Sequence, residues 1–192
     1  SQNLLHDNHA PENTPQAAGC MMSQDVFVEV GHGPTLIDNN VMLSKASVRI
    51  ATEGVACVHN LIAGAFTAVG NGTDMNVNGV NQPRYTPYHI RHRTEVAGFM
   101  TILHGDDRFY NNIFVQKYPV KEVEVKEDMG FMMADNQVVG TDVFDEYPTY
   151  DEWISWFEMD KPADMMKMTE YHFAHLPVWV NGNAYFNGAK AC

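Results

Sequence analysis

A short phrase that recurs at uneven intervals constrains the fold of this chain more than any other feature. Each copy is a polar residue, an Asn and then two or more apolar residues, and the Asn residues are Asn3, Asn40, Asn60 and Asn112. The shortest interval, 20 residues, is about one turn of a parallel β-solenoid, and the longer intervals fit one turn plus an inserted loop. Asn side chains at equivalent bends stack and hydrogen-bond one another. The phrase therefore predicts an all-β chain built as a parallel solenoid.

The strands expected from the rest of the pattern are short. Residues 26–30 alternate strictly, with the three valines on one face and Phe27 and Glu29 on the other. Residues 69–94 lack a periodic apolar run and predict a long polar loop, which in a solenoid is a usual place for a binding surface. Residues 117–175 are acidic and rich in Met and aromatic residues, and predict a long excursion from the stack with a short helix.

The sequence at both ends of the chain has the pattern expected within a solenoid. Ser1 stands just before the first phrase, and residues 183–188 resemble the start of another turn. We therefore expect residues 1–192 to be part of a single solenoid domain, truncated at both ends, with 117–175 as an insertion.

The net charge of the chain limits the classes of partner that it can bind. The formal net charge is −12, which argues against nucleic acid and anionic membrane surfaces as partners. No apolar stretch is long enough to cross a bilayer. An acidic chain rich in aromatic residues suits neutral, hydroxyl-rich ligands such as sugars.

Glu29 is the first candidate for chemistry. It shares a strand face with Phe27 and precedes the turn Gly31-His32-Gly33-Pro34. A carboxyl group beside an aromatic ring and partly screened from water suits a general acid. The competing interpretation is an ordinary exposed glutamate in a strand.

Two polar clusters are further candidates. Residues 84–95 concentrate His, Arg and Tyr side chains, with His89, His92 and Glu95 spaced three apart. Pro87 argues against the helix that a metal site with this spacing would need, so hydrogen bonding to a polyhydroxyl ligand is favoured. In the run Asp106-Asp107-Arg108, one carboxylate is expected to pair with Arg108 and the other to face a groove.

The order of these motifs resembles glycoside hydrolase family 120, which are β-xylosidases built on a right-handed parallel β-helix. The resemblance is carried by the run DVFVEVGHGP at 25–34 and by residues 36–40, 58–64, 86–89, 94–98 and 105–114. It covers most of residues 1–115 and weakly 178–190. It implies a right-handed parallel β-helix that hydrolyses β-xylosides or xylo-oligosaccharides with retention. No metal or cofactor is expected. Such a bacterial enzyme could be cytoplasmic, or periplasmic or secreted.

The resemblance also implies roles for particular residues. Glu29 falls at the acid/base position, and the nucleophile is expected to be an Asp one turn earlier, upstream of Ser1. A fragment without that turn would have little activity, because covalent catalysis needs both carboxyl groups. The residues implied to hold the sugar are His32, His89, His92, Glu95, Asp107 and Arg108.

Two other functions stay open at this point. A polysaccharide lyase on the same kind of solenoid would need a basic residue as the catalytic base, and only the arginines of residues 84–93 favour it. An acidic chain would also repel a uronate polymer. A non-catalytic solenoid that binds glycans would need no pair of carboxyl groups on neighbouring turns.

Overall fold

Three parallel sheets make up most of the computed structural model, which describes residues 1–9, 24–29, 31–68, 75–77, 80–82, 85–90, 92–120, 138–157 and 174–192. The first sheet contains β1 (Leu4–Leu5), β4 (Val41–Met42), β7 (Leu61–Ile62), β14 (Ile113–Val115) and β16 (Ala184–Phe186). The second contains β2 (Gln24–Glu29), β5 (Ala46–Ala51) and β8 (Ala65–Ala68). The third contains β3 (Thr35–Asp38), β6 (Val55–Val58), β13 (Asp107–Tyr110) and β15 (Val178–Asn181).

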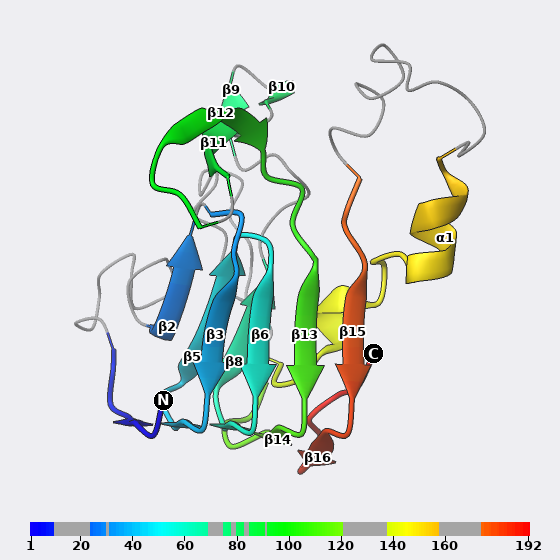
Figure 1. Cartoon of the computed structure of the whole chain (residues 1–192). Helices are drawn as coiled ribbons and strands as arrows, with labels where there is room; N and C mark the ends of the chain where they lie inside the picture. The colour runs from blue at the N-terminus through cyan, green and yellow to red at the C-terminus, as the bar shows by residue number, and fades with distance from the viewer. Residues whose placement is uncertain are drawn as a thin grey trace.

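The chain visits the three sheets in the same order on successive turns. Strands β1, β2 and β3 are followed by β4, β5 and β6, and each strand pairs in parallel with its counterpart one turn later. Strands β7 and β8 begin the next turn. Figure 1 shows β3, β6, β13 and β15 side by side and pointing the same way. The prediction of an all-β chain with parallel sheets is confirmed.

A ladder of Asn side chains builds the corner between the third and first sheets. In each step the side-chain oxygen of one Asn accepts the backbone N–H and the side-chain amide of the Asn one turn earlier, at 2.8–3.2 Å. The ladder residues are Asn3, Asn40, Asn60, Asn112 and Asn183. The stacking predicted for the first four is confirmed, and Asn183 adds a fifth member.

The residue before each ladder Asn has a positive φ, between 54° and 68°. These residues are Gln2, Asn39, His59, Asn111 and Gly182. A single left-handed residue turns the chain sharply, and the following Asn then bonds the neighbouring turns. As a result the corner has two residues between the strands on every turn where both strands are described.

Apolar side chains from all three sheets fill the interior of the stack. Phe66, Phe109 and Phe114 are fully buried, and the ring of Phe66 lies 5.4 Å from that of Phe109 in an edge-to-face contact. Val28 packs against this core from β2, while Phe27 on the opposite face lies against Arg49 at 5.8 Å. The alternation predicted for this strand therefore separates a core face from an outer face.

Part of the segment expected to leave the stack belongs to it. The N–H of Phe66 donates to the carbonyl of Val138 at 3.2 Å, and Gly140 forms a parallel bridge with Lys190. The 3-10 helix η3 (Asp142–Phe144) comes next in the chain. The buried side chains of Val139 and of Phe144 in η3 extend the core beside β8. Within the predicted excursion 117–175, residues 138–144 therefore pack on the stack, because apolar burial holds them in place.

The short helix predicted in this segment is α1 (Tyr150–Ser155). It begins at a capping box, in which the Thr149 hydroxyl accepts the N–H of Glu152 and the Glu152 carboxylate accepts the N–H of Thr149. These contacts satisfy amide groups that the first helical turn leaves without partners.

Two antiparallel strand pairs stand apart from the parallel sheets. They are β9 (Met75–Val77) with β10 (Val80–Gln82), and β11 (Tyr85–His89) with β12 (Val96–Thr101). The segment 69–94, predicted as a long polar loop, therefore contains the strands β9, β10 and β11. Most side chains of β11 and β12 are exposed, so no alternation of apolar residues marks these strands in the sequence. Figure 1 places this hairpin above the strands of the third sheet.

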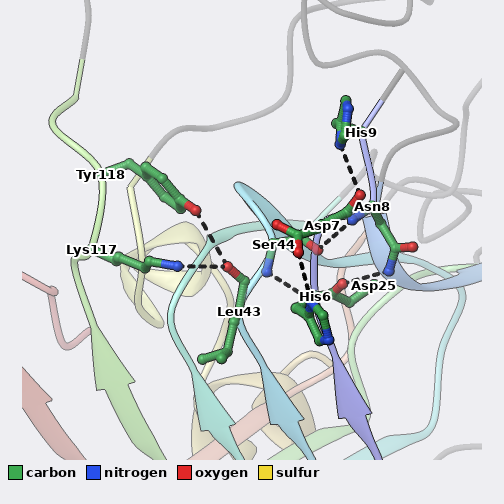
Figure 2. Close-up of polar contacts among 9 residues, drawn as sticks. All are labelled: His6, Asp7, Asn8, His9, Asp25, Leu43, Ser44, Lys117 and Tyr118. Carbon is green, nitrogen blue, oxygen red and sulfur yellow. Dashed lines mark hydrogen bonds and ion pairs between the residues drawn. The ribbon is translucent and has the colours of Figure 1, made fainter. Parts of the chain in front are cut away.

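Polar contacts join the chain where it passes from the first sheet to the second (Figure 2). The Asp25 carboxylate accepts the side-chain amide of Asn8 at 2.7 Å and the backbone N–H of Ser44 at 3.0 Å. The hydroxyl of Ser44 in turn accepts the backbone N–H of Asn8 at 2.9 Å. Lys117 donates to the carbonyl of Leu43 at 3.3 Å. These bonds connect three turns of the stack, those that begin with β1, β4 and β14, and give this corner a structural role.

Candidate functional site

A pocket of about 990 Å³ opens where the chain passes from the second sheet to the third. Its volume is within the range of small-molecule sites. The turn 31–34 between β2 and β3 lines one part of it, next to Gly54 and Ala56 of the following turn. Residues 86–89 of β11 line another part, together with His92. Asp106 and Arg108, at the start of β13, complete the lining.

Glycines from three turns come close together at the corner that bears this pocket. Gly33, Gly54 and Gly105 have φ values of 65°, 75° and 90°. The Gly54 N–H donates to the carbonyl of Gly105 at 3.0 Å, and its own carbonyl accepts the N–H of Thr35 at 2.9 Å. A β-carbon added at Gly33 would lie 2.7 Å from the carbonyl oxygen of Gly54. Only glycine permits turns that stack this closely.

Replacing Gly105 with alanine tests this stack. The new β-carbon would lie 2.2 Å from the carbonyl oxygen of Leu176, at a φ that disfavours any side chain. We expect Gly105→Ala to lower the free energy of unfolding by about 2–4 kcal/mol, measured by chemical denaturation. Gly98→Ala is the matched control, because a β-carbon there meets nothing within 4 Å. Equal stability of the two variants would contradict the close stacking.

His32 and Glu53 form an enclosed pair in the pocket wall. The Nδ1 atom of His32 lies 2.6 Å from Oε1 of Glu53, and the two side chains are 12% and 13% exposed. The second carboxylate oxygen, Oε2, accepts the N–H of Leu103 at 2.9 Å. The ring of Tyr88 meets the His32 ring edge to face at 5.9 Å. His32 is therefore held on two sides, by a carboxylate and by an aromatic ring.

Asp106 and Arg108 form a second polar group in the lining. The Arg108 guanidinium lies 2.9 Å from Oδ1 of Asp106 and donates to the Asp106 carbonyl oxygen at 2.6 Å. It also stacks over the ring of Trp179 at 4.4 Å. The sequence predicted that one of two adjacent carboxylates pairs with Arg108, and that carboxylate is Asp106. The guanidinium is thus oriented by both charge and stacking.

Asp107 does not line the pocket, which corrects its place among the expected sugar contacts. Its side chain is 1% exposed and accepts the N–H of Val55 at 2.8 Å in the interior. Burial away from water raises the pKa of this carboxyl to about 8, and the charges of Asp106 and Glu53 act in the same direction. Its hydrogen bond from Val55 and the charge of Arg108 oppose this rise.

Glu29 lies at the edge of the pocket region. It ends β2, its side chain is exposed, and the pocket lining begins at Gly31. In the register of the second sheet its partner on β5 is Ala51. Glu29 is not among the residues that line the pocket within the described part of the chain.

Some residues of the cluster at 84–95 line the pocket and others lie outside it. His89 and His92 line the pocket. Glu95 lies outside the lining, although its carbonyl oxygen is 3.2 Å from Nδ1 of His89. The pocket therefore contains four of the six residues expected to contact sugar, namely His32, His89, His92 and Arg108. Within the described ranges, no three His, Cys, Asp or Glu side chains are placed to hold a metal ion.

Sequence reasoning missed Glu53 as a member of this site, and it did not single out Tyr88 or Asp106 within the clusters that contain them. The repeat could have identified Glu53, because Glu53-Gly54 precedes β6 as Gly33-Pro34 precedes β3. No local pattern identifies Tyr88, since its place depends on how the β11–β12 hairpin lies over the corner turns.

Comparisons with protein-family models, with curated proteins and with solved structures found no match to this chain. Among the described residues, no helix has the length and apolar character needed to cross a membrane.

Proposed function

We propose that this chain belongs to a retaining glycoside hydrolase that acts on β-xylosides or xylo-oligosaccharides, similar to glycoside hydrolase family 120. The observation that carries the proposal is the position of the pocket. Its lining begins at Gly31 and includes His32, directly after the strand that ends in Glu29. The same run, 25–34, carries the family resemblance. In this proposal Glu29 is the general acid and base.

The register of the second sheet limits where the catalytic partner can lie. Retaining enzymes need two carboxyl groups about 5–5.5 Å apart, close to the spacing of adjacent strands. On the β5 side of Glu29 the aligned residue is Ala51. Strand β2 is at the end of the order β2-β5-β8, so its other side can accept a further strand. The nucleophile is therefore proposed to be an Asp on a preceding turn, upstream of Ser1.

The right-handed β-helix is part of the proposal. The chain passes in constant order between three parallel sheets. Crossover connections between parallel strands are right-handed in about 98% of proteins, which supports this hand.

The pocket chemistry supports a neutral, polyhydroxyl ligand. His32, His89 and His92 offer imidazole groups, and Arg108 offers a fixed guanidinium next to the Asp106 carboxylate. Alternating hydroxyl donors and acceptors on a sugar match such a mixture. We propose that these residues hold the sugar, whereas Glu95 and the buried Asp107 do not contact it.

The test is turnover of an aryl β-xyloside by the natural full-length protein. We expect Glu29→Ala to lower kcat about 10²–10⁴-fold, because the water that hydrolyses the glycosyl-enzyme loses its general base. Added azide should restore turnover and give the β-glycosyl azide, since a small anion can replace water once no base is present. Glu146→Ala, an exposed glutamate in the turn after η3, is the matched control and should retain wild-type activity.

Other outcomes would redirect the proposal. Glu29→Ala with wild-type turnover would remove Glu29 from the mechanism. Cleavage of a uronate polymer that depends on calcium, without xyloside turnover, would favour the lyase. Sugar binding without turnover of either substrate would favour a non-catalytic solenoid.

A further inference from the structure

Both oxygens of the Glu53 carboxylate are engaged within the protein. Oε1 contacts His32 Nδ1 at 2.6 Å, and Oε2 accepts the N–H of Leu103 at 2.9 Å. An ionised carboxylate can only accept hydrogen bonds, so the proton of this short contact lies on Nδ1 of His32. In a neutral imidazole the other nitrogen, Nε2, is then an acceptor.

The Nε2 atom of His32 is buried and has no hydrogen-bond partner in the part of the chain that the structure describes. Leaving a buried polar atom unpaired costs about 1–3 kcal/mol, and such atoms are few in folded proteins. His32 lines the pocket, and so does Tyr88, whose side chain packs on its ring and is 37% exposed. Exposed side chains change rotamer within nanoseconds, so the position of Tyr88 beside this ring is not fixed.

We propose that Glu53 is a positioning residue that fixes His32 in the Nδ1-protonated form, so that Nε2 accepts a hydrogen bond from a ligand hydroxyl. The hydroxyl is assigned to a sugar on the basis of the proposed function. The protonation pattern of His32 does not depend on that function, because it follows from the contact with Glu53.

The first experiment reads the imidazole nitrogens directly, by ¹⁵N NMR of the labelled protein at about pH 8, where an ordinary imidazole is neutral. His32→Phe identifies the His32 resonances. We expect Nε2 to be the unprotonated nitrogen in the wild type. In Glu53→Gln the amide oxygen can keep the Leu103 contact while the NH₂ group faces Nδ1. The proton should therefore move to Nε2.

The exposed pair His6–Asp7 provides the matched control. Its Nδ1–Oδ2 distance is 2.7 Å, but its side chains are 54% and 85% exposed. Asp7→Asn should leave the His32 resonances unchanged. If it shifts them as Glu53→Gln does, the effect is not specific to the enclosed pair and the proposal fails.

The second experiment titrates methyl β-D-xyloside into the same proteins. Saturation should shift the His32 Nε2 resonance of the wild type, and Glu53→Gln should weaken binding about tenfold, because an acceptor becomes a donor. In the His32→Phe background, Glu53→Gln should cause no further loss, since Glu53 acts only through His32. A loss that persists in that background would overturn the positioning role.

The outcomes separate this inference from the proposed function. An unprotonated Nδ1, or protons on both nitrogens, in the wild type overturns the inference even if aryl xyloside is hydrolysed. Protonation at Nδ1 with no response of Nε2 to the xyloside overturns the assignment of this atom to a sugar hydroxyl, whether or not xyloside is hydrolysed. Absence of turnover with a clear shift at Nε2 supports the inference and overturns the hydrolase.

Discussion

Replacing Asn60 with leucine is expected to lower the free energy of unfolding by about 3–5 kcal/mol. Asn60 is 2% exposed, and its side-chain oxygen accepts the N–H of Asn40 at 3.0 Å and the Asn40 amide at 3.1 Å. Its own amide donates to the carbonyl of Ile37 at 2.9 Å and to Asn112 at 3.1 Å. Leucine fills a similar volume but leaves these groups buried and unpaired, so most of the cost is lost hydrogen bonding.

The neighbouring Asn39 provides the matched control. It lies in the equivalent bend one turn earlier, with φ 54°, and its side chain bonds only Asp38, at the surface, in the contacts that the structure gives it. Glycine also adopts this φ, so Asn39→Gly should cost about 1 kcal/mol or less. Urea denaturation monitored by circular dichroism measures both variants. Similar losses at the two positions would show that the bend, and not the ladder, stabilises this corner.

Asp107→Asn is expected to stabilise the protein progressively more, relative to wild type, as the pH rises from about 4 to about 8. Burial raises the pKa of this carboxyl to about 8, so the folded chain keeps a proton that the unfolded chain releases near pH 4. Wild-type stability is therefore fully present below about pH 4 and falls as the pH rises toward 8. The slope is at most about 1.4 kcal/mol per pH unit, so over about four pH units the total is at most about 5 kcal/mol.

Asparagine keeps an oxygen that can accept the N–H of Val55 and carries no charge at any pH. The difference in unfolding free energy between Asp107→Asn and wild type should thus be near zero at pH 4 and largest at pH 8. Asp145→Asn, at an exposed position, is the matched control for the loss of a surface carboxylate. A difference for Asp107→Asn that does not change with pH would mean that the pKa of this carboxyl is the same in the folded and unfolded chain.

The placement of Asp106 and Asp107 shows what could be predicted from sequence and what could not. Phe109 is buried, and residues two apart in a strand face the same side, so Asp107 must face inward once β13 is known to begin there. That starting point depends on Asp106, whose positive φ of 53° makes it the last residue of the bend. The sequence alone does not determine which of the two carboxylates faces inward, because either Asp could begin the strand.

The Asn ladder could be predicted because, unlike the start of β13, it is determined by a local pattern. Each ladder Asn stands between a left-handed residue and an apolar strand, so one local pattern identifies four of them, while Asn183 follows Gly182 instead of a polar residue. The pocket is different, since it joins the turn 31–34 to β11 and Arg108, and no short pattern spans them. Sequence therefore identified the framework and several lining residues, while the contact between His32 and Glu53 required the three-dimensional arrangement.

The two-residue bends of the Asn corner differ from the pocket corner in how much their length can vary. Their length is constant at the Asn corner, whereas the passage from the second sheet to the third varies from a three-residue turn at 52–54 to the long segment between β8 and β13. The entropy cost of lengthening a loop grows slowly with its length. Segments at the pocket corner could therefore be exchanged between related proteins, altering ligand preference while strand register stays set at the far corner. Loop grafting onto this framework, with the five ladder residues unchanged, is a direct route to new binding specificities.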